Sequence, residues 1–218
     1  MISKQKVLGV VLAGGLGRRM GGGDKPMTDL LGRSILDHVL ERTRPQCNGM
    51  IINANGDPAR FQSFGLPVVP DGIEGYPGPL AGVLASMDWA AQNSPMVTHI
   101  MSFAGDAPFI PRDLVAHLMK PILAGADMAR AKSFGQRHPV FAIWPVRVRA
   151  DLRDKLVNQE MRKIDLFTAA YDITEVDFTG VPDPFFNINT PEDRDEAIRI
   201  LSAQRRDGEG FAKSSKEA

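Results

Sequence analysis

The sequence contains only one cysteine, Cys47, among its 218 residues. A single thiol cannot form an internal disulfide, and the cysteine and histidine residues show no zinc-site spacing. This cysteine usage is typical of a reducing compartment, so we expect a cytoplasmic protein. The apolar run Val7–Ala13 is too short for a signal peptide and opens into glycines, so we also expect no secretion signal.

The chain also lacks long hydrophobic runs and an excess of charge of either sign. No stretch approaches the ~20 consecutive apolar residues that span a membrane. Lysine and arginine together number 26, as do aspartate and glutamate, and this balance provides no electrostatic footprint for DNA or RNA. We therefore expect no membrane and no nucleic-acid partner, and any anionic ligand must be held by a local cluster of cations.

The remaining composition is that of an ordinary globular protein, with 43% hydrophobic residues. We find no internal repeat and no linker, and the length suits one domain. The prediction is a single domain over residues 1–204, which we expect to be monomeric. Residues 205–218 are rich in glycine, serine, lysine and glutamate, and we expect a mobile tail there.

Short apolar runs alternate with helical patterns along the chain. The runs predict strands at residues 7–13, 50–53, 68–69, 98–103, 127–131, 139–144 and 173–177. Helices are predicted to start after Ser34, at Pro79 and at Pro111, and to cover about 147–158, 160–170 and 191–204. Such alternation predicts an α/β fold, a single Rossmann-like domain with a mostly parallel sheet and helices on both faces.

Four of the predicted strands end at a glycine or a polar residue. Gly14, Asn53, Asp71 and Asp106 each lie at or just after such an end. Because the carboxyl ends of parallel strands share one edge of the sheet, these residues are predicted to meet there. Ligands of open α/β sheets bind at that edge.

A glycine-rich segment, Gly14–Lys25, follows the first strand. Glycines allow backbone N–H groups to approach a ligand and to form an anion-binding nest. Arg18, Arg19 and Lys25 add positive charge, so the segment suits a triphosphate. We expect Asp24 to be an internal partner of Arg18 or Lys25 rather than a ligand.

Two common phosphate-binding loops do not fit this segment. A P-loop needs serine or threonine after its lysine, whereas Pro26 follows Lys25. A dinucleotide-binding fingerprint needs G-x-G-x-x-G; Gly15 and Gly17 fit it, but Met20 occupies the last position. A P-loop NTPase and a Rossmann dehydrogenase are therefore disfavoured.

The segment instead resembles the signature of nucleotidyltransferases, and its double glycine resembles that of the molybdenum cofactor guanylyltransferases, the MobA family. Related cytidylyltransferases usually carry alanine where Gly15 stands. Gly17 departs from the wider superfamily, which often has serine there. The resemblance extends from residue 7 to about 204, through Leu12–Gly15, Arg19–Gly21, Asp24–Lys25, Asn53, Asp71, Tyr76–Gly82, Gly105–Pro108 and Phe186–Glu192.

The resemblance implies transfer of GMP from GTP to the phosphate of molybdopterin, with release of pyrophosphate. Two like charges ~4 Å apart repel by about 4 kcal/mol at an effective dielectric constant of ~20, so a metal and fixed cations must neutralise the phosphates. Asp106 is the predicted carboxylate ligand of Mg²⁺. Arg19 and Lys25 are predicted to hold the β- and γ-phosphates; these three residues form the predicted catalytic set.

The resemblance also implies which residues contact the two substrates. On the nucleotide side these are Leu12, Ala13, Gly14, Gly15, Lys25, Asn53, Asp71 and Asp106, with Asp71 on either the guanine or the ribose. Asn187 and Asn189 are predicted near the metal and the pterin, although both suit a local turn equally well. Arg137 and His138 are further candidates for the pterin or its phosphate.

Two alternatives remain open from the sequence. One is molybdopterin cytidylyltransferase or another small nucleotidyltransferase of the same fold. The other is a non-catalytic protein that delivers the cofactor. Transient contacts with molybdopterin-inserting proteins and molybdoenzymes are compatible with any of these functions.

Overall fold

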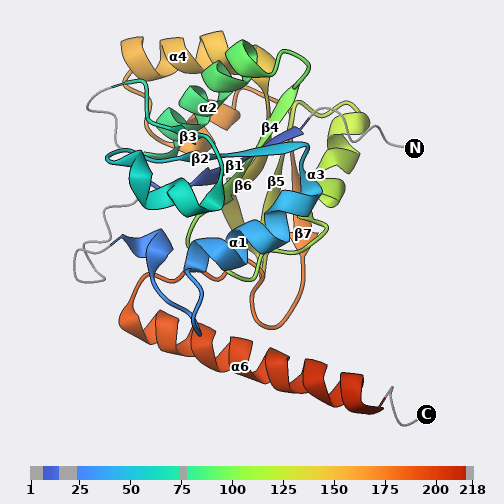
Figure 1. The fold of residues 1–218 in the computed structure, drawn as a ribbon. Helices are drawn as coiled ribbons and strands as arrows, with labels where there is room; N and C mark the ends of the chain where they lie inside the picture. The colour runs from blue at the N-terminus through green and yellow to red at the C-terminus, as the bar shows by residue number, and fades with distance from the viewer. Residues whose placement is uncertain (1–6, 15–23, 74–77, 215–218) are drawn as a thin grey trace.

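The computed structural model describes residues 7–14, 24–73 and 78–214, with side chains to residue 206. Its strands form one seven-stranded sheet in the order β3-β2-β1-β4-β6-β5-β7 (Figure 1). All pairs are parallel except those made by β6, so the predicted mostly parallel sheet is confirmed. The strands are β1 (Val7–Leu12), β2 (Gly49–Asn53), β3 (Val68–Val69), β4 (His99–Ala104), β5 (Met128–Ser133), β6 (Gln136–Pro145) and β7 (Ile173–Phe178).

The buried strand β1 sends alternate side chains to two separate hydrophobic cores. Val7 and Val11 belong to one core, and Leu8 and Val10 to the other. A strand buried on both faces reads as a continuous apolar run because successive side chains point to opposite faces. The apolar run at the start of the sequence is therefore explained by a central position in the sheet.

Helices cover both faces of the sheet, as predicted. Residues of α1 (Ile35–Thr43), α3 (Leu114–Leu123) and α6 (Pro191–Ser214) contribute to the core that contains Val11. Residues of α2 (Pro79–Asn93), α4 (Arg149–Asn158) and α5 (Ile164–Thr168) contribute to the other core. Figure 1 shows α2 and α4 on one side of the sheet and α1 and α6 on the opposite side.

Two predicted helix starts are confirmed in detail. Ser34 caps α1 through a capping box, in which Asp37 N–H donates to Ser34 Oγ at 3.1 Å and Ser34 N–H donates to Asp37 Oδ2 at 2.9 Å. Pro79 is the first residue of α2. The apolar stripe of α2 is buried and comprises Leu80, Val83, Leu84 and Met87.

Several boundaries differ from the prediction for local backbone reasons. The helix expected at Pro111 begins only at Leu114, because Asp113 has a non-helical backbone (φ −123°, ψ 12°). The helix expected over 160–170 covers only Ile164–Thr168, since Glu160 has a positive φ of 49° and Lys163 is extended. The last helix continues beyond residue 204 to Ser214.

The hairpin between β5 and β6 was not recognised in the sequence. Phe134 and Gly135 connect these strands with positive φ angles of 48° and 77°, the backbone of a tight hairpin turn. Strand β6 consequently starts at Gln136, three residues before the predicted start. Residues 136–139 extend past the last β4–β6 pair, Ser102 with Ala142.

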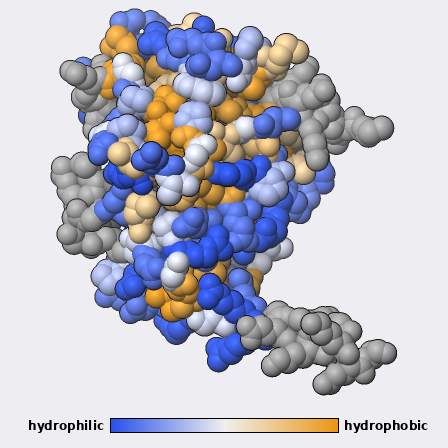
Figure 2. Space-filling view, in the orientation of Figure 1, coloured by the Kyte–Doolittle hydropathy of each residue, from blue (hydrophilic) through white to orange (hydrophobic). Residues whose placement is uncertain are grey.

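Short 3-10 helices occupy several of the connections between these elements. They are η2 (Lys25–Met27), η3 (Arg44–Gln46), η4 (Pro58–Phe64) and η5 (Val146–Val148). Over the face drawn in Figure 2, hydrophilic residues are widespread and apolar residues gather in smaller patches between them. Among the described helices, none combines the length and apolarity needed to cross a membrane.

The contacts of α6 predict how a truncated chain behaves. Ala197 and Leu201 are buried in the core, whereas residues 203–206 are exposed. We expect a chain ending at Ser202 to keep the melting temperature of the full chain within about 2 °C, because little buried area is lost. Leu201→Ala should instead lower the free energy of unfolding by about 2 kcal/mol or more. Thermal unfolding of the three proteins measures both effects; a truncated chain as unstable as Leu201→Ala would contradict the prediction.

Candidate functional site

A cavity of about 520 Å³ opens at the carboxyl edge of the parallel strands. Residues at or just after the ends of four strands line it. These strand ends lie level because of the sheet register, in which Leu12 is opposite both Asn53 and Ala104, and Asn53 is opposite Val69. The residues predicted from the sequence that line this cavity are Leu12, Ala13, Gly14, Lys25, Asn53, Asp71, Asp106 and Asn187. The prediction that four strand ends meet at one edge is confirmed. Gly15 and Arg19 lie outside the described residues.

Close backbone packing holds the loops after β1 and β4 together at this edge. Gly105 N–H donates to Leu12 O at 3.1 Å. A Cβ atom on Gly105 would lie 3.1 Å from Leu12 O and 3.3 Å from Ala13 Cα, tighter than ordinary contact. Glycine before Asp106 therefore lets this carboxylate approach the start of the glycine-rich segment.

Lys25 and Asp106 form the charged end of the cavity. Lys25 Nζ lies 2.5 Å from Asp106 Oδ2 and donates to Asn189 Oδ1 at 2.7 Å. The lysine side chain is only 12% exposed and the aspartate 23%, so water screens this pair less than it screens a surface pair. A cation and a carboxylate thus face the same ligand space.

The segment before α6 delivers Asn189 to this pair. Asp193 Oδ2 accepts from Asn189 N–H at 2.8 Å and from Thr190 N–H at 2.9 Å, and Asp193 N–H donates to Thr190 Oγ1 at 3.2 Å. Ile188 N–H donates to Asp106 O at 3.0 Å. Thr190, which caps the start of α6, therefore belongs to a turn that also positions an amide beside Lys25.

The single carboxylate of Asp106 suits a divalent metal ion that is also bound by phosphate oxygens of a ligand. Within the described residues, no three histidine, cysteine, aspartate or glutamate side chains gather as a metal cluster. Asp106 is a single carboxylate at the cavity wall, and Mg²⁺ is commonly held by one or two carboxylates together with substrate phosphates and water. Asp106 fits that mode of binding.

Two asparagines fix Asp71, which follows β3 and is separated from Asp106, after β4, by strands β2 and β1, so it lies toward the other end of the cavity. Asn53 is 4% exposed, and its amide donates to Val69 O at 3.0 Å and to Asp71 Oδ1 at 2.9 Å. Asn55 donates to Asp71 Oδ2 at 2.8 Å, and its own Oδ1 accepts from Asp71 N–H at 2.8 Å. A carboxylate has about four acceptor positions, so Asp71 keeps acceptor capacity for a ligand.

Asn53 depends on a glycine in the neighbouring helix. A Cβ atom on Gly82 of α2 would lie 2.1 Å from Asn53 Oδ1, too close for any real contact. Gly82 therefore allows α2 to pack against the buried amide. Since both amide hydrogens of Asn53 are donated within the protein, this residue acts by holding Asp71.

Sequence reasoning missed two polar residues of the cavity wall, Asn55 and Arg60. Asn55 could have been noticed because it lies two residues after Asn53. Arg60 lies in the short helix η4, which no motif marks. Its Nη1 lies 3.1 Å from Asp24 Oδ2. Asp24 is thus an internal ion-pair partner, but of Arg60 rather than of Lys25, which turns toward Asp106; Arg18, the other expected partner, lies outside the described residues.

The structure places Arg137 and His138 on the part of β6 that continues past its last pair with β4 and pairs with β5, and neither lines the cavity. Arg137 Nε lies 2.6 Å from Glu175 Oε1. His138 Nε2 lies 2.7 Å from Ser133 Oγ, and its ring centroid lies 4.6 Å from that of Phe185. Burial lowers the pKa of His138 below its ordinary value, which favours a neutral ring at pH 7.

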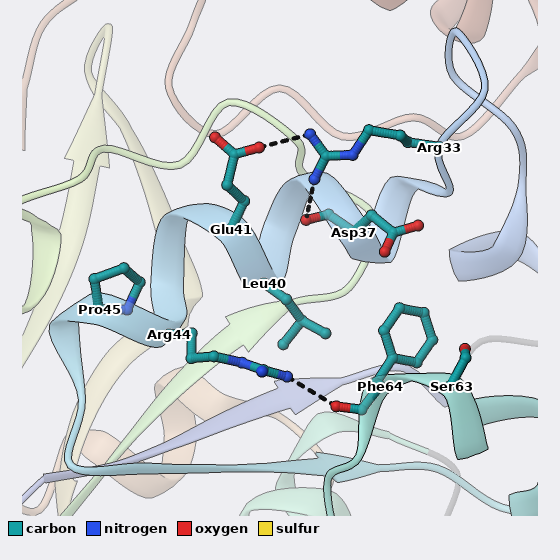
Figure 3. Close-up of a pocket in the computed structure, with 8 residues that line it drawn as sticks. All are labelled: Arg33, Asp37, Leu40, Glu41, Arg44, Pro45, Ser63 and Phe64. Carbon is teal, nitrogen blue, oxygen red and sulfur yellow. Dashed lines mark hydrogen bonds and ion pairs between the residues drawn. The ribbon is translucent and has the colours of Figure 1, made fainter.

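A second, smaller cavity of about 330 Å³ lies between α1 and η4 (Figure 3). Its charged groups pair with each other: Arg33 Nη1 lies 2.6 Å from Glu41 Oε2, and hydrogen bonds from Arg33 and Arg112 lower the pKa of Glu41 to about 2. Arg44 donates to Phe64 O at 2.9 Å. No residue predicted for the site lines this cavity.

Comparison with known proteins gives consistent results. The family model described as a MobA-like NTP transferase domain matches residues 9–170. The chain is 53% identical over 203 residues to a protein of Bradyrhizobium sp. (strain ORS 278) named molybdenum cofactor guanylyltransferase, covering 92% of this chain and 96% of that protein. It is also 53% identical over 193 residues to a protein of the same name from Rhodopseudomonas palustris (strain BisB5), covering 88% and 92%.

A solved structure has the same fold. It is the molybdopterin-guanine dinucleotide biosynthesis protein A of Archaeoglobus fulgidus, with a TM-score of 0.71 and 24% sequence identity. The match covers 90% of this chain and 99% of that one. The single-domain α/β architecture is therefore shared with this protein.

The contact between Gly82 and Asn53 predicts non-additive effects of substitution. Gly82→Ala should displace Asn53, and each buried polar group left without a partner costs about 1–3 kcal/mol. The gain in helix propensity, about 1 kcal/mol, offsets only part of that loss. In an Asn53→Ala background the same substitution should be neutral or stabilising. Chemical denaturation of the four proteins measures this coupling; equal effects of Gly82→Ala in both backgrounds would refute the clash.

Proposed function

The chain belongs to the MobA-like NTP transferase family, and we propose that it is a molybdenum cofactor guanylyltransferase. It transfers GMP from GTP to the phosphate of molybdopterin and forms the guanine dinucleotide cofactor. The observation that carries the proposal is one cavity with a cation–carboxylate pair, Lys25 and Asp106, at one end and the braced acceptor Asp71 at the other. The identity of 53% to proteins of that name supports the choice of reaction.

The reaction requires positioning and charge neutralisation rather than a covalent intermediate on the protein. An oxygen of the molybdopterin phosphate attacks the α-phosphorus of GTP, the bond to the bridging α–β oxygen breaks, and pyrophosphate leaves with the electron pair. Preorganised cations stabilise charge that develops on the leaving group. Lys25 supplies such a cation, and Arg19 supplies a second in the proposal.

Asp106 would hold a divalent metal ion, Mg²⁺ in this proposal. When bound, that ion would supply additional positive charge for the phosphates. Lys25 would contact the phosphates as well, which its flexible side chain permits. The contact with Asn189 provides a second acceptor that keeps Lys25 at the edge of the cavity.

The guanosine lies at the Asp71 end in this proposal. The backbone of Leu12, Ala13 and Gly14, with Gly15 after them, lines the nucleotide. Asp71 accepts from guanine N1–H and N2–H₂, which a carboxylate does with two parallel hydrogen bonds. Asn53 contributes by fixing the carboxylate.

The acceptor lies on the side of Asn187 and Asn189, close to the charged end of the cavity. Arg137 and His138 belong to the β5–β6 hairpin, past the last pair of β6 with β4, where the distal part of a pterin is accommodated in the proposal. A monomer is sufficient for this activity in the proposal. It would contact the proteins that supply molybdopterin and those that receive the product only transiently.

The nucleotide used decides between the proposed function and its closest alternative. We expect pyrophosphate release with molybdopterin, Mg²⁺ and GTP, and release at least about 100-fold slower with CTP, ATP or UTP. This is a lower bound, since a site built to hydrogen-bond one substrate can reject an analogue lacking those groups by about 10⁴-fold or more. Omission of molybdopterin provides the control. Faster release with CTP would identify a cytidylyltransferase, and tight binding of molybdopterin without release would identify a carrier.

Asp106→Asn separates catalysis from binding. The amide keeps the shape of the side chain but removes the charge that attracts the metal, so we expect Mg²⁺-dependent kcat to fall by about 100-fold or more, the scale of one lost electrostatic contact in a transition state. The dissociation constant for GTP should change much less. Turnover and calorimetric titration with GTP measure the two quantities, and equal losses in both would assign Asp106 to binding alone.

A further inference from the structure

Guanine presents more than the edge that Asp71 can read. Its N1–H and N2–H₂ groups are donors, whereas O6 and N7 are acceptors. The Asp71 carboxylate has no hydrogen to donate when ionised. A site that recognises the whole base therefore needs a donor group near Asp71, directed at O6 and N7.

Most of the described polar side chains in the cavity cannot supply that donor. Asn53 donates both amide hydrogens, to Val69 O and to Asp71. Lys25 is engaged at the other end by Asp106 and Asn189. Asn55 donates one hydrogen to Asp71 and is neutral. Asn187 also lines the cavity, but it lies two residues before Asn189, which accepts from Lys25 at the charged end.

Arg60 is the lining side chain that carries several donors and contacts the residues around Asp71. Its Nη2 donates to Asn55 O at 3.0 Å, and Asn55 donates in turn to Asp71, so one residue connects the guanidinium with the carboxylate. A guanidinium carries five N–H groups. Its Nε–H is buried without a hydrogen-bond partner in the part of the chain that the structure describes.

The guanidinium is also held in a fixed orientation. Asp24 Oδ2 lies 3.1 Å from Nη1, and the guanidinium carbon lies 4.5 Å from the ring centroid of Phe61. These contacts restrict the side chain without using all of its donors. A planar donor held in place on one side is suited to bidentate recognition of a ligand on the other.

We propose that Arg60 determines specificity for guanine by donating to O6 and N7, while Asp71 accepts from N1–H and N2–H₂. This inference rests on the proposed function, since it places guanine at the Asp71 end of the cavity. Arginine bound to guanine O6 and N7 is the commonest specific arginine–base contact in DNA recognition, and its geometry is that of a planar fork. Cytosine and uracil lack this pair of acceptors, and adenine has an amino group in place of O6.

Three nucleotides test the two edges separately by calorimetric titration in the presence of Mg²⁺. GTP carries both edges, 7-deaza-GTP lacks N7, and ITP lacks the N2 amino group. We expect the full chain to bind 7-deaza-GTP and ITP each about 5- to 100-fold more weakly than GTP, the range for one good bidentate contact.

Each analogue should bind more weakly than GTP, and we call that loss of affinity its penalty. Each substitution should then remove the penalty of one analogue and leave that of the other. Arg60→Met should weaken GTP binding, bind 7-deaza-GTP as well as GTP, and keep the full penalty for ITP. Asp71→Asn should show the reverse pattern. Arg60→Lys keeps the charge without the planar fork, so we expect it to recover GTP affinity only in part. Full recovery of GTP affinity with lysine, without any loss of affinity for 7-deaza-GTP relative to GTP, would assign Arg60 to the phosphates and overturn the proposal.

Arg44→Met is the matched control. Arg44 also binds a backbone oxygen beside the same short helix η4, at Phe64 (Figure 3), but it does not line the nucleotide cavity. We expect this variant to keep all three affinities. If Arg60→Met lowered binding of the three nucleotides by one common factor, Arg60 would only brace Asp24 and Asn55, and the proposal would be wrong.

The readouts distinguish this inference from the proposed function. Pyrophosphate release from GTP without any penalty for 7-deaza-GTP would remove Arg60 from base recognition and leave the guanylyltransferase intact. The expected pattern of affinities without pyrophosphate release would retain guanine recognition by Arg60 and remove the transfer reaction.

Discussion

The parallel pairing of β1 with β2 and with β4 is the constraint on which the site depends. The register sets Leu12 opposite Asn53 on one side and opposite Ala104 on the other. The next residues of all three strands therefore leave the sheet at one level. Because β1 is buried on both faces, a shift in register would misplace its apolar side chains in both cores. The same burial that stabilises the sheet thus fixes the positions of the polar groups at its edge.

Glycines allow the backbone at this edge to approach as closely as the site requires. Gly105 brings the chain before Asp106 against Leu12 O, and Gly82 leaves space for the Asn53 amide beneath α2. In both places the obstacle to a side chain is a neighbouring polar atom rather than the conformation of the glycine itself. The positions of Asp71 and Asp106 therefore depend on how closely the backbone packs at Gly82 and Gly105.

The cavity contains two polar groups of different kinds, an ion pair and a hydrogen-bonded cluster. Lys25 and Asp106 form a charged pair, which the proposed function assigns to the phosphates and the metal. Asp71, Asn53 and Asn55 form a hydrogen-bonded group, which the proposed function assigns to the base. Arg60 connects the two regions through Asp24, the neighbour of Lys25, and through Asn55. The net charge of the chain is zero, so in the proposed function a triphosphate is held by charges that are placed locally.

Much of this arrangement followed from the sequence by itself. The apolar run of β1, the cap at Ser34 and the proline at the start of α2 are local signals, and periodicity and capping depend on neighbouring residues. The strand ends at Gly14, Asn53, Asp71 and Asp106 could be predicted to meet, since parallel strands share one carboxyl edge. Only the tertiary structure decided which side chains pair across it. Lys25 pairs with Asp106, and Asp24 pairs with Arg60. Both pairings join loops far apart in the chain, and the second depends on the path of η4, a short connection without a periodic pattern. The hairpin at Phe134 and Gly135 carries glycine at its second turn residue but phenylalanine, which rarely adopts a positive φ, at the first, so the pattern typical of such turns is only half present.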